Sequence, residues 1–171
     1  MSFTVRRAGI ERLDDLAPLW IAMQAQHESV APPALTTEVA PFRDHAESWR
    51  RRRASYASWF ASDNAVLHVA EDTEGELTGY AMVRLSGAWS QLATPEAMAE
   101  LESLSVAAAH RGRGLGTLLL AAVHADLRER GIEVMTLAVF AGNDAAGRFY
   151  ARHSMQPILT HMIGRVPPEP W

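Results

Sequence analysis

Apolar side chains recur along the chain at two different spacings, one typical of amphipathic helices and one typical of strands. Leu13, Leu16 and Trp20 lie at helical intervals, as do Trp49 and Tyr56. The helices predicted in this way span Leu13–Gln26, Asp44–Ala61, Gly114–Arg130 and Asn143–His153. Shorter apolar runs between polar turns predict strands at Phe3–Ala8, Ala65–Asp72, Leu77–Ser86, Met98–Val106, Ile132–Phe140 and Pro157–Val166.

Three places in this pattern predict interruptions of regular secondary structure: a bulge, an irregular connection and a helix end. Leu101 is out of phase with Leu104 and Val106 for a flat strand, so we expect a β-bulge between them. The segment His27–Phe42 carries three prolines and has no period, which indicates an irregular connection. Gly131 follows the third predicted helix, at the position where a glycine commonly ends a helix.

Composition narrows the class of protein. The 171 residues, 48% of them hydrophobic, suit a single domain over residues 1–171 with a full core. A formal net charge of −4 argues against nucleic acid as a partner. The basic run Arg50–Arg53 fits a solvated helix face or, alternatively, a patch for a partner or a phosphate. No run reaches the roughly 18 apolar residues of a membrane span, and the N-terminus lacks the apolar block of a signal peptide, so we expect a cytoplasmic protein without membrane contact.

Two absences restrict the chemistry. The chain contains no cysteine, which excludes disulfides, thiolate metal sites and cysteine nucleophiles. Its 7 histidines include no His-x-x-x-His pair, so we expect no metal site.

The segment Arg111–Thr117 places three glycines between a predicted strand and a predicted helix. A nucleotide P-loop would need a lysine before Thr117, where Gly116 stands. A dinucleotide-binding turn would need its third glycine one position later and an acidic residue at the end of the next strand, whereas Glu133 lies at its start. The remaining interpretation is that the loop amides and the helix N-terminus bind an anion such as a pyrophosphate. The alternative is that the glycines serve only a tight turn and close packing.

This segment, RGRGLG, resembles the acetyl-CoA signature Q/R-x-x-G-x-G/A of the GNAT superfamily of N-acetyltransferases, with Arg111, Gly114 and Gly116 at the signature positions. The longer segment LESLSVAAAHRGRGLG is similar to the fourth strand and pyrophosphate loop of the family, and NDAAGRFYARHSMQP is similar to its N-x-x-A-x-x-F-Y block. One departure concerns the end of the last helix, where Ser154 and Met155 replace the usual Gly-Phe.

The resemblance implies an α/β (α+β) fold, a single GNAT-like domain with a central, mixed and mostly antiparallel sheet. Met98–Val106 and Ile132–Phe140 should be parallel, because a helix connects them, and splayed at their ends. It also implies acetyl-CoA as co-substrate. The implied cofactor-binding residues are Leu104, Ser105, Val106, Arg111, Gly112, Arg113, Gly114, Leu115, Gly116, Thr117, Asn143, Ala146 and Phe149.

Acyl transfer to an amine needs a deprotonated amine, a polarised carbonyl and a proton for the leaving thiolate. By resemblance, Tyr150 is the general acid and Asn143 bonds the pantetheine arm; the alternative for Tyr150 is a half-buried core aromatic. Glu102 is the candidate base, with Glu100 in reserve, and the alternative is an ordinary surface glutamate. Backbone groups at Leu104 and Val106, freed by the bulge, would pair with pantetheine. Without a cysteine, the amine attacks directly in a ternary complex.

The acceptor is expected to be a small primary amine, and the acidic residues favour a cationic one. Recognition should come from His27–Phe42, from the loop Gly87–Ala97 with Trp89, and from the C-terminal strand and tail. The alternative function is a non-catalytic acyl-CoA-binding module. The identity of the amine, the length of the acyl group and the choice between monomer and homodimer stay open.

Overall fold

The computed structural model describes residues 2–33, 36 and 39–166. The chain forms two compact units. The first contains Met1–Met23 and His45–Ala138, and the second contains Gln24–Asp44 and Val139–Trp171. Helix α1 (Ala17–Val30) begins in the first unit and ends in the second.

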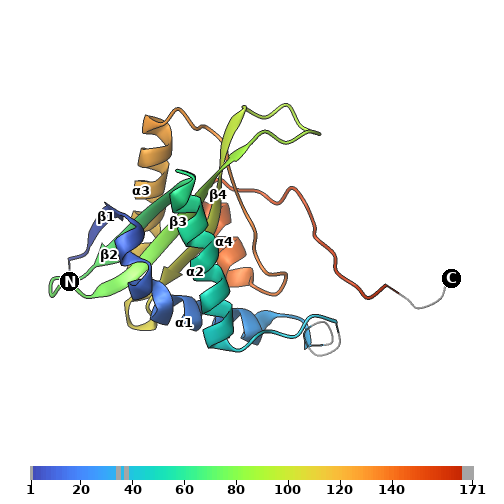
Figure 1. The fold of residues 1–171 in the computed structure, drawn as a ribbon, viewed down its shortest axis with the longest axis horizontal. Coiled ribbons are helices and arrows are strands. Elements are labelled where there is room, and N and C mark those ends of the chain that lie inside the picture. The colour runs from blue at the N-terminus through green and yellow to red at the C-terminus, as the bar shows by residue number, and fades with distance from the viewer. Residues whose placement is uncertain (1, 34–35, 37–38, 167–171) are drawn as a thin grey trace. The chain divides into compact units, whose positions relative to one another are not determined.

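The first unit is built on a five-stranded sheet with the strands in sequence order (Figure 1). Its strands are β1 (Thr4–Ala8), β2 (Ala65–Glu71), β3 (Leu77–Gly87), β4 (Ala97–Val106) and β5 (Met135–Leu137). Neighbouring strands are antiparallel, except that β4 and β5 are parallel across α3 (Leu115–Glu129). The predicted mixed, mostly antiparallel sheet with one parallel pair is therefore confirmed.

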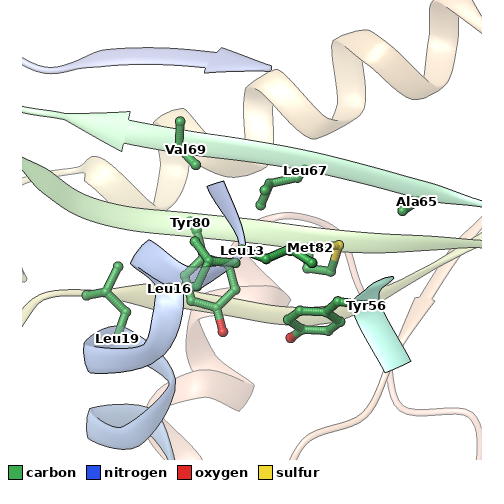
Figure 2. Close-up of a cluster of buried hydrophobic side chains, with 9 residues drawn as sticks. All are labelled: Leu13, Leu16, Leu19, Tyr56, Ala65, Leu67, Val69, Tyr80 and Met82. Atoms are coloured by element: carbon green, nitrogen blue, oxygen red, sulfur yellow. The ribbon is translucent and has the colours of Figure 1, made fainter. Parts of the chain in front are cut away.

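Helices pack on both faces of this sheet. On one face, α2 (His45–Ala61) and the turns before α1 cover a cluster of buried side chains that Figure 2 shows. The members of this cluster are Leu13, Leu16, Leu19, Tyr56, Ala65, Leu67, Val69, Tyr80 and Met82. On the other face, α3 presents Leu115, Leu119, Leu120, Val123 and Leu127, all buried. The alternation of β3 explains this arrangement, because Tyr80 and Met82 face the first layer while Gly79 faces Leu119.

Gly79 permits the close approach of α3 to the sheet. A Cβ at this position would lie 2.9 Å from the carbonyl oxygen of Ser105 and 3.1 Å from a methyl carbon of Leu119. One interpretation of the glycine cluster was that it allows close helix–sheet packing. In the structure Gly79 of β3, which the sequence analysis did not single out, allows this packing.

Three predicted elements differ from the structure. Strand β5 is shorter than Ile132–Phe140, because Ile132 belongs to the turn that ends α3, where its amide donates to the Leu127 carbonyl at 2.9 Å. The predicted strand Pro157–Val166 was wrong: the structure assigns no strand there, because an apolar run becomes a strand only when another strand pairs with it. The helix predicted over Leu13–Gln26 is shifted: short turns precede α1, which begins at Ala17 and continues to Val30, so the connection predicted from His27 begins later.

The second unit contains α4 (Asp144–Arg152) and an aromatic cluster. Phe140 stacks on His27 with ring centroids 4.6 Å apart and lies 5.8 Å from Phe42. None of the helices in residues 2–33, 36 and 39–166 has the length and apolar character that a bilayer crossing requires.

Candidate functional site

The glycine turn leads directly into the N-terminus of α3. Gly112 and Gly114 have φ angles of +72° and +80°, in the left-handed region that favours glycine. A Cβ at either position would meet no atom within 4 Å, so conformation rather than packing requires these glycines. Of the predicted residues, Arg111 to Gly114 form the turn, while Leu115, Gly116 and Thr117 form the first turn of α3. The expected strand–glycine turn–helix arrangement is confirmed.

Arg111 fixes the start of this turn. Its Nε donates to the Val106 carbonyl at 3.0 Å, so the guanidinium lies against the last residue of β4. The sequence analysis proposed the Val106 backbone as a contact for pantetheine, but its carbonyl is already bonded to the Arg111 side chain. Leu115, at the first position of α3, is buried and anchors the helix on the sheet.

Strand β4 carries a bulge where its pairing with β5 stops. Ser103 pairs with Met82 of β3, and Leu101 pairs with the next β3 residue, Val83. Glu102, which lies between Leu101 and Ser103, therefore has no partner on β3. The parallel pairing with β5 ends at Leu101. From Glu102 to Val106, no described β5 residue lies opposite β4, so the backbone groups on this edge, apart from the Val106 carbonyl, have no β5 strand to pair with. The predicted bulge is confirmed, and the pairing between the two parallel strands ends beside it, where β5 ends.

Serine side chains on β4 point into the core rather than toward a ligand. Ser105 donates to the Leu19 carbonyl at 3.0 Å, and Ser103 shares a 2.6 Å hydrogen bond with the hydroxyl of Tyr56. Burial raises the pKa of Tyr56, so this hydroxyl stays protonated. Of the predicted cofactor-binding residues, Ser105 can contribute only backbone groups, while Leu104 is half-buried on the opposite face of β4.

The candidate base belongs to a cluster of four charged side chains. Glu102 accepts a hydrogen bond from Arg52 Nη1 at 3.0 Å, and its other oxygen lies 3.2 Å from Arg84 Nε. Arg84 also pairs with Glu100. We call these four residues the Glu102 cluster.

The two arginines were not predicted as site residues. Arg84 lies on β3, opposite Glu100, and the antiparallel register brings the two together. Arg52 belongs to the basic run of α2, in which the helical rotation points successive side chains in different directions. Arg50 and Arg51 pair with Glu47, and Arg53 pairs with Asp14. Only the Arg52 side chain of this run reaches Glu102 on the sheet. Three of the four arginines thus form the solvated helix face that the sequence favoured, and Arg52 is the exception.

Helix α4 of the second unit carries the remaining predicted residues. Asn143 caps this helix, and its side-chain oxygen accepts from the Ala146 amide at 3.1 Å. Its amide nitrogen is the group left for a ligand. Tyr150 is half-buried, and burial raises its pKa to about 12, so the phenol stays protonated at neutral pH. Phe149 contacts Tyr150 edge to face, with centroids 5.1 Å apart.

The end of α4 shows how the chain accommodates its departure from the family pattern. Ser154 adopts a left-handed φ of 65°, which is the conformation that a glycine would take here. Its amide donates to the Ala151 carbonyl, and the Met155 amide donates to the Tyr150 carbonyl, both at 3.1 Å. The helix therefore ends in the usual way, at a cost in backbone strain.

Comparison with known proteins decides the family. Residues 33–155 match the acetyltransferase (GNAT) family. The chain belongs to this family. A mycothiol acetyltransferase from Clavibacter sepedonicus is 30% identical over 140 residues, which cover 79% of this chain and 42% of that relative. The GNAT chain described here therefore spans less than half the length of this curated relative.

Solved structures share the fold. A GCN5-related N-acetyltransferase from Ralstonia eutropha JMP134 matches with a TM-score of 0.74 and 21% identity, over 96% of this chain and 99% of that chain. An aminoglycoside acetyltransferase from an uncultured soil metagenomic sample matches with a TM-score of 0.65 and 15% identity, over 96% of this chain and 97% of that chain. The sheet with parallel β4 and β5 is thus the GNAT fold.

Proposed function

We propose that this GNAT chain transfers an acetyl group from acetyl-CoA to a primary amine by direct attack in a ternary complex. The observation that carries the proposal is the course of one segment. In it, β4 runs past the end of its pairing with β5 at Leu101, bulges at Glu102, and continues through the glycine turn into α3. This segment offers, in chain order, a carboxylate, an open backbone edge and a helix N-terminus, which suit an amine, a pantetheine arm and a pyrophosphate respectively.

The residues present fit acetyl-CoA. The space in front of Gly112 and Gly114 is open, and the α3 N-terminus favours negative charge. Acetyl-CoA supplies the thioester that is attacked. The amides from Arg111 to Thr117 bind its pyrophosphate, and the backbone of Leu104 together with the Val106 amide binds the pantetheine arm. Among the residues that the structure describes, no group of three or more histidine or acidic side chains could hold a metal ion.

Two side chains handle protons in this proposal. Glu102 accepts the proton of the acceptor ammonium, directly or through a water. Tyr150 delivers a proton to the leaving thiolate, and its raised pKa keeps that proton on the phenol at neutral pH. Asn143 bonds the pantetheine arm with its amide nitrogen, and Ala146 and Phe149 line the same face of α4 for it.

The acceptor is a small molecule in this proposal. The mycothiol acetyltransferase that the chain resembles is named for a small-molecule acceptor, and so is the aminoglycoside acetyltransferase that shares the fold. A small acceptor also suits the half-buried position of Glu102, whose side chain is 15% exposed.

Ligand-dependent thermal unfolding tests the binding site. CoA at about 100 times its Kd should stabilise the protein by roughly 2.7 kcal/mol. Gly114→Glu should abolish this shift, because the carboxylate takes the place of the anion. Gly131→Glu is the matched control, since Gly131 has a similar φ of +71° and open space but follows the other end of α3. An equal loss of the shift in both variants would contradict the site.

Turnover separates an enzyme from a binding module. Tyr150→Phe keeps the ring, so CoA should still bind, while release of CoA in the presence of amines should fall on the order of 10²–10⁴-fold. Near-normal turnover would make Tyr150 a packing residue. If the wild type binds CoA but acetylates no amine in a broad panel, the chain is a non-catalytic module.

A further inference from the structure

The Glu102 cluster contains two carboxylates and two guanidinium groups, so its formal charge is zero. Its side chains come from three elements, Arg52 on α2, Arg84 on β3, and both Glu100 and Glu102 on β4. They are partly withdrawn from water, with side-chain exposures of 15% for Glu102 and 30% for Arg52. A site built only for a cationic amine would leave its carboxylates free to attract it, whereas these are already neutralised.

Aromatic side chains hold the two guanidinium groups in place. The Cζ atom of Arg52 lies 4.8 Å from the ring centroid of Trp20 and 5.7 Å from that of Tyr56, and Arg84 lies 5.5 Å above Trp59. Aromatic contacts therefore hold Arg52 in addition to its bond to Glu102.

The cluster and the neighbouring Trp20 carry buried hydrogen-bond donors without acceptors. Trp20 is 8% exposed, and its buried Nε1 has no hydrogen-bond partner among the described residues. The Nε of Arg84 is buried too, and its approach to Glu102 lacks hydrogen-bond geometry. Buried donors are normally satisfied, and an anion with free lone pairs would supply the acceptor that these two N–H groups need.

An ammonium group that reaches Glu102 must replace Arg52. The displaced guanidinium would then be a partly buried charge without a partner, unless the incoming molecule also brings an anion. We propose that the acceptor is a zwitterionic amine of the amino-acid class, whose ammonium group binds Glu102 and whose carboxylate binds Arg52 and the indole N–H of Trp20. This inference rests on the proposed function and specifies its acceptor.

Matched acceptor pairs provide the test. For each of several amino acids, kcat/KM is measured beside that of its carboxamide, which keeps the amine and side chain but loses the negative charge. The wild type should prefer the acid by about tenfold or more. The comparison is conservative, because the amide has the lower amine pKa and carries more of the reactive free amine.

Two variants locate the preference. Arg52→Gln should remove it, because kcat/KM should fall about tenfold more for the acid than for the carboxamide, chiefly through a higher KM for the acid. Arg51→Gln is the matched control, because Arg51 is the adjacent arginine on α2 and pairs with Glu47 instead. Trp20→Phe keeps the ring under Arg52 and should weaken the preference by removing only the N–H donor.

The outcomes divide clearly. Equal or better turnover of carboxamides by the wild type overturns the inference and leaves the proposed acetyl transfer intact. An equal loss for both members of a pair in Arg52→Gln also overturns it. If Arg52→Gln does not fold, the wild-type preference and Trp20→Phe decide. If CoA shifts the unfolding temperature but no acceptor is acetylated, the proposed function fails and the inference fails with it.

Discussion

Two glutamates of the sheet, Glu71 and Glu102, are held by two arginines each, yet their surroundings differ. Glu71 accepts two hydrogen bonds from Arg6, both 2.9 Å long, and one of 2.6 Å from Arg12. Its side chain is 16% exposed, close to the 15% of Glu102. Burial and charge pairing therefore do not distinguish the two carboxylates.

Backbone position distinguishes them. Glu71 has a strand partner on each side, Thr4 on β1 and Leu77 on β3, whereas Glu102 is the residue that the β4 bulge leaves unpaired. The hydrogen bonds from Arg6, and then those from Arg12, lower the pKa of Glu71 to about 2. In the proposed function, the guanidinium pairs of Glu71 stabilise the fold, while those of Glu102 occupy the site that the acceptor enters.

The largest contrast should appear in turnover at neutral pH. Glu102→Gln keeps the shape of the side chain and removes the base, so kcat/KM should fall on the order of 10²–10⁴-fold. Glu71→Gln should stay within about twofold of wild type. Steady-state release of CoA measures both, with circular dichroism confirming that each variant folds. Equal losses in the two variants would break the comparison.

Stability should show the opposite contrast. The folded-state pKa of Glu71, about 2, lies below its ordinary value of 4.5, so its ion pairs stabilise the protein above pH 4.5. This stabilisation is lost as the pH falls toward 2. Glu71→Gln should therefore lower the free energy of unfolding at pH 7 by on the order of 1 kcal/mol, with the deficit shrinking below pH 4.5. Thermal unfolding at several pH values would contradict this if the variant matched wild type at pH 7.

A substitution outside the sheet gives a stability change that should leave turnover unaffected. Ser154→Gly relieves the left-handed φ of 65° after α4 and should raise the free energy of unfolding by about 0.5–1 kcal/mol. Asp63→Gly is the matched control, because Asp63 has a φ of 56° but aspartate tolerates this region better, so its gain should be smaller. Urea unfolding measures both, and no gain at Ser154 would show that the strain is negligible.

The smallest effect concerns His68, a buried residue of β2 whose charged neighbours include neither Glu71 nor Glu102. Burial lowers its pKa below 6.5, with Arg7 and Arg130 lowering it further and Asp126 opposing them. The neutral imidazole is thus favoured in the folded state, and stability should decline as the pH falls below 6.5, before Glu71 protonates. His68→Gln should remove this first decline in a pH series of unfolding temperatures and leave the second. A decline that persists in His68→Gln would assign it to another group.

Much of this arrangement follows from local sequence. The glycine turn, the bulge after Leu101 and the helix predicted from Asn143 each depend on residues within a few positions of one another, and each is confirmed. The pairing of Arg52 and Arg84 with Glu102 could not be predicted in this way. It requires the rotation of α2 about its axis and the register of β3 against β4, which are set by tertiary packing.

The sequence also predicted one strand that the structure does not contain. The apolar run Pro157–Val166 has the composition of a strand, but Met162 and Val166 are 93% and 92% exposed, and no strand partner is assigned to the run. A strand is stabilised by its neighbour, so a sequence pattern predicts only where one can form.

The pH dependence of kcat/KM in Glu102→Gln tests the central claim most directly. If Glu102 takes the proton of the acceptor, the deficit of the variant should shrink as the pH rises, because more of the amine is already deprotonated. Glu71→Gln should follow the wild-type profile throughout. A Glu102→Gln profile parallel to that of wild type, with the same deficit at every pH, would contradict the account and assign the base to Glu100, to a water or to no residue.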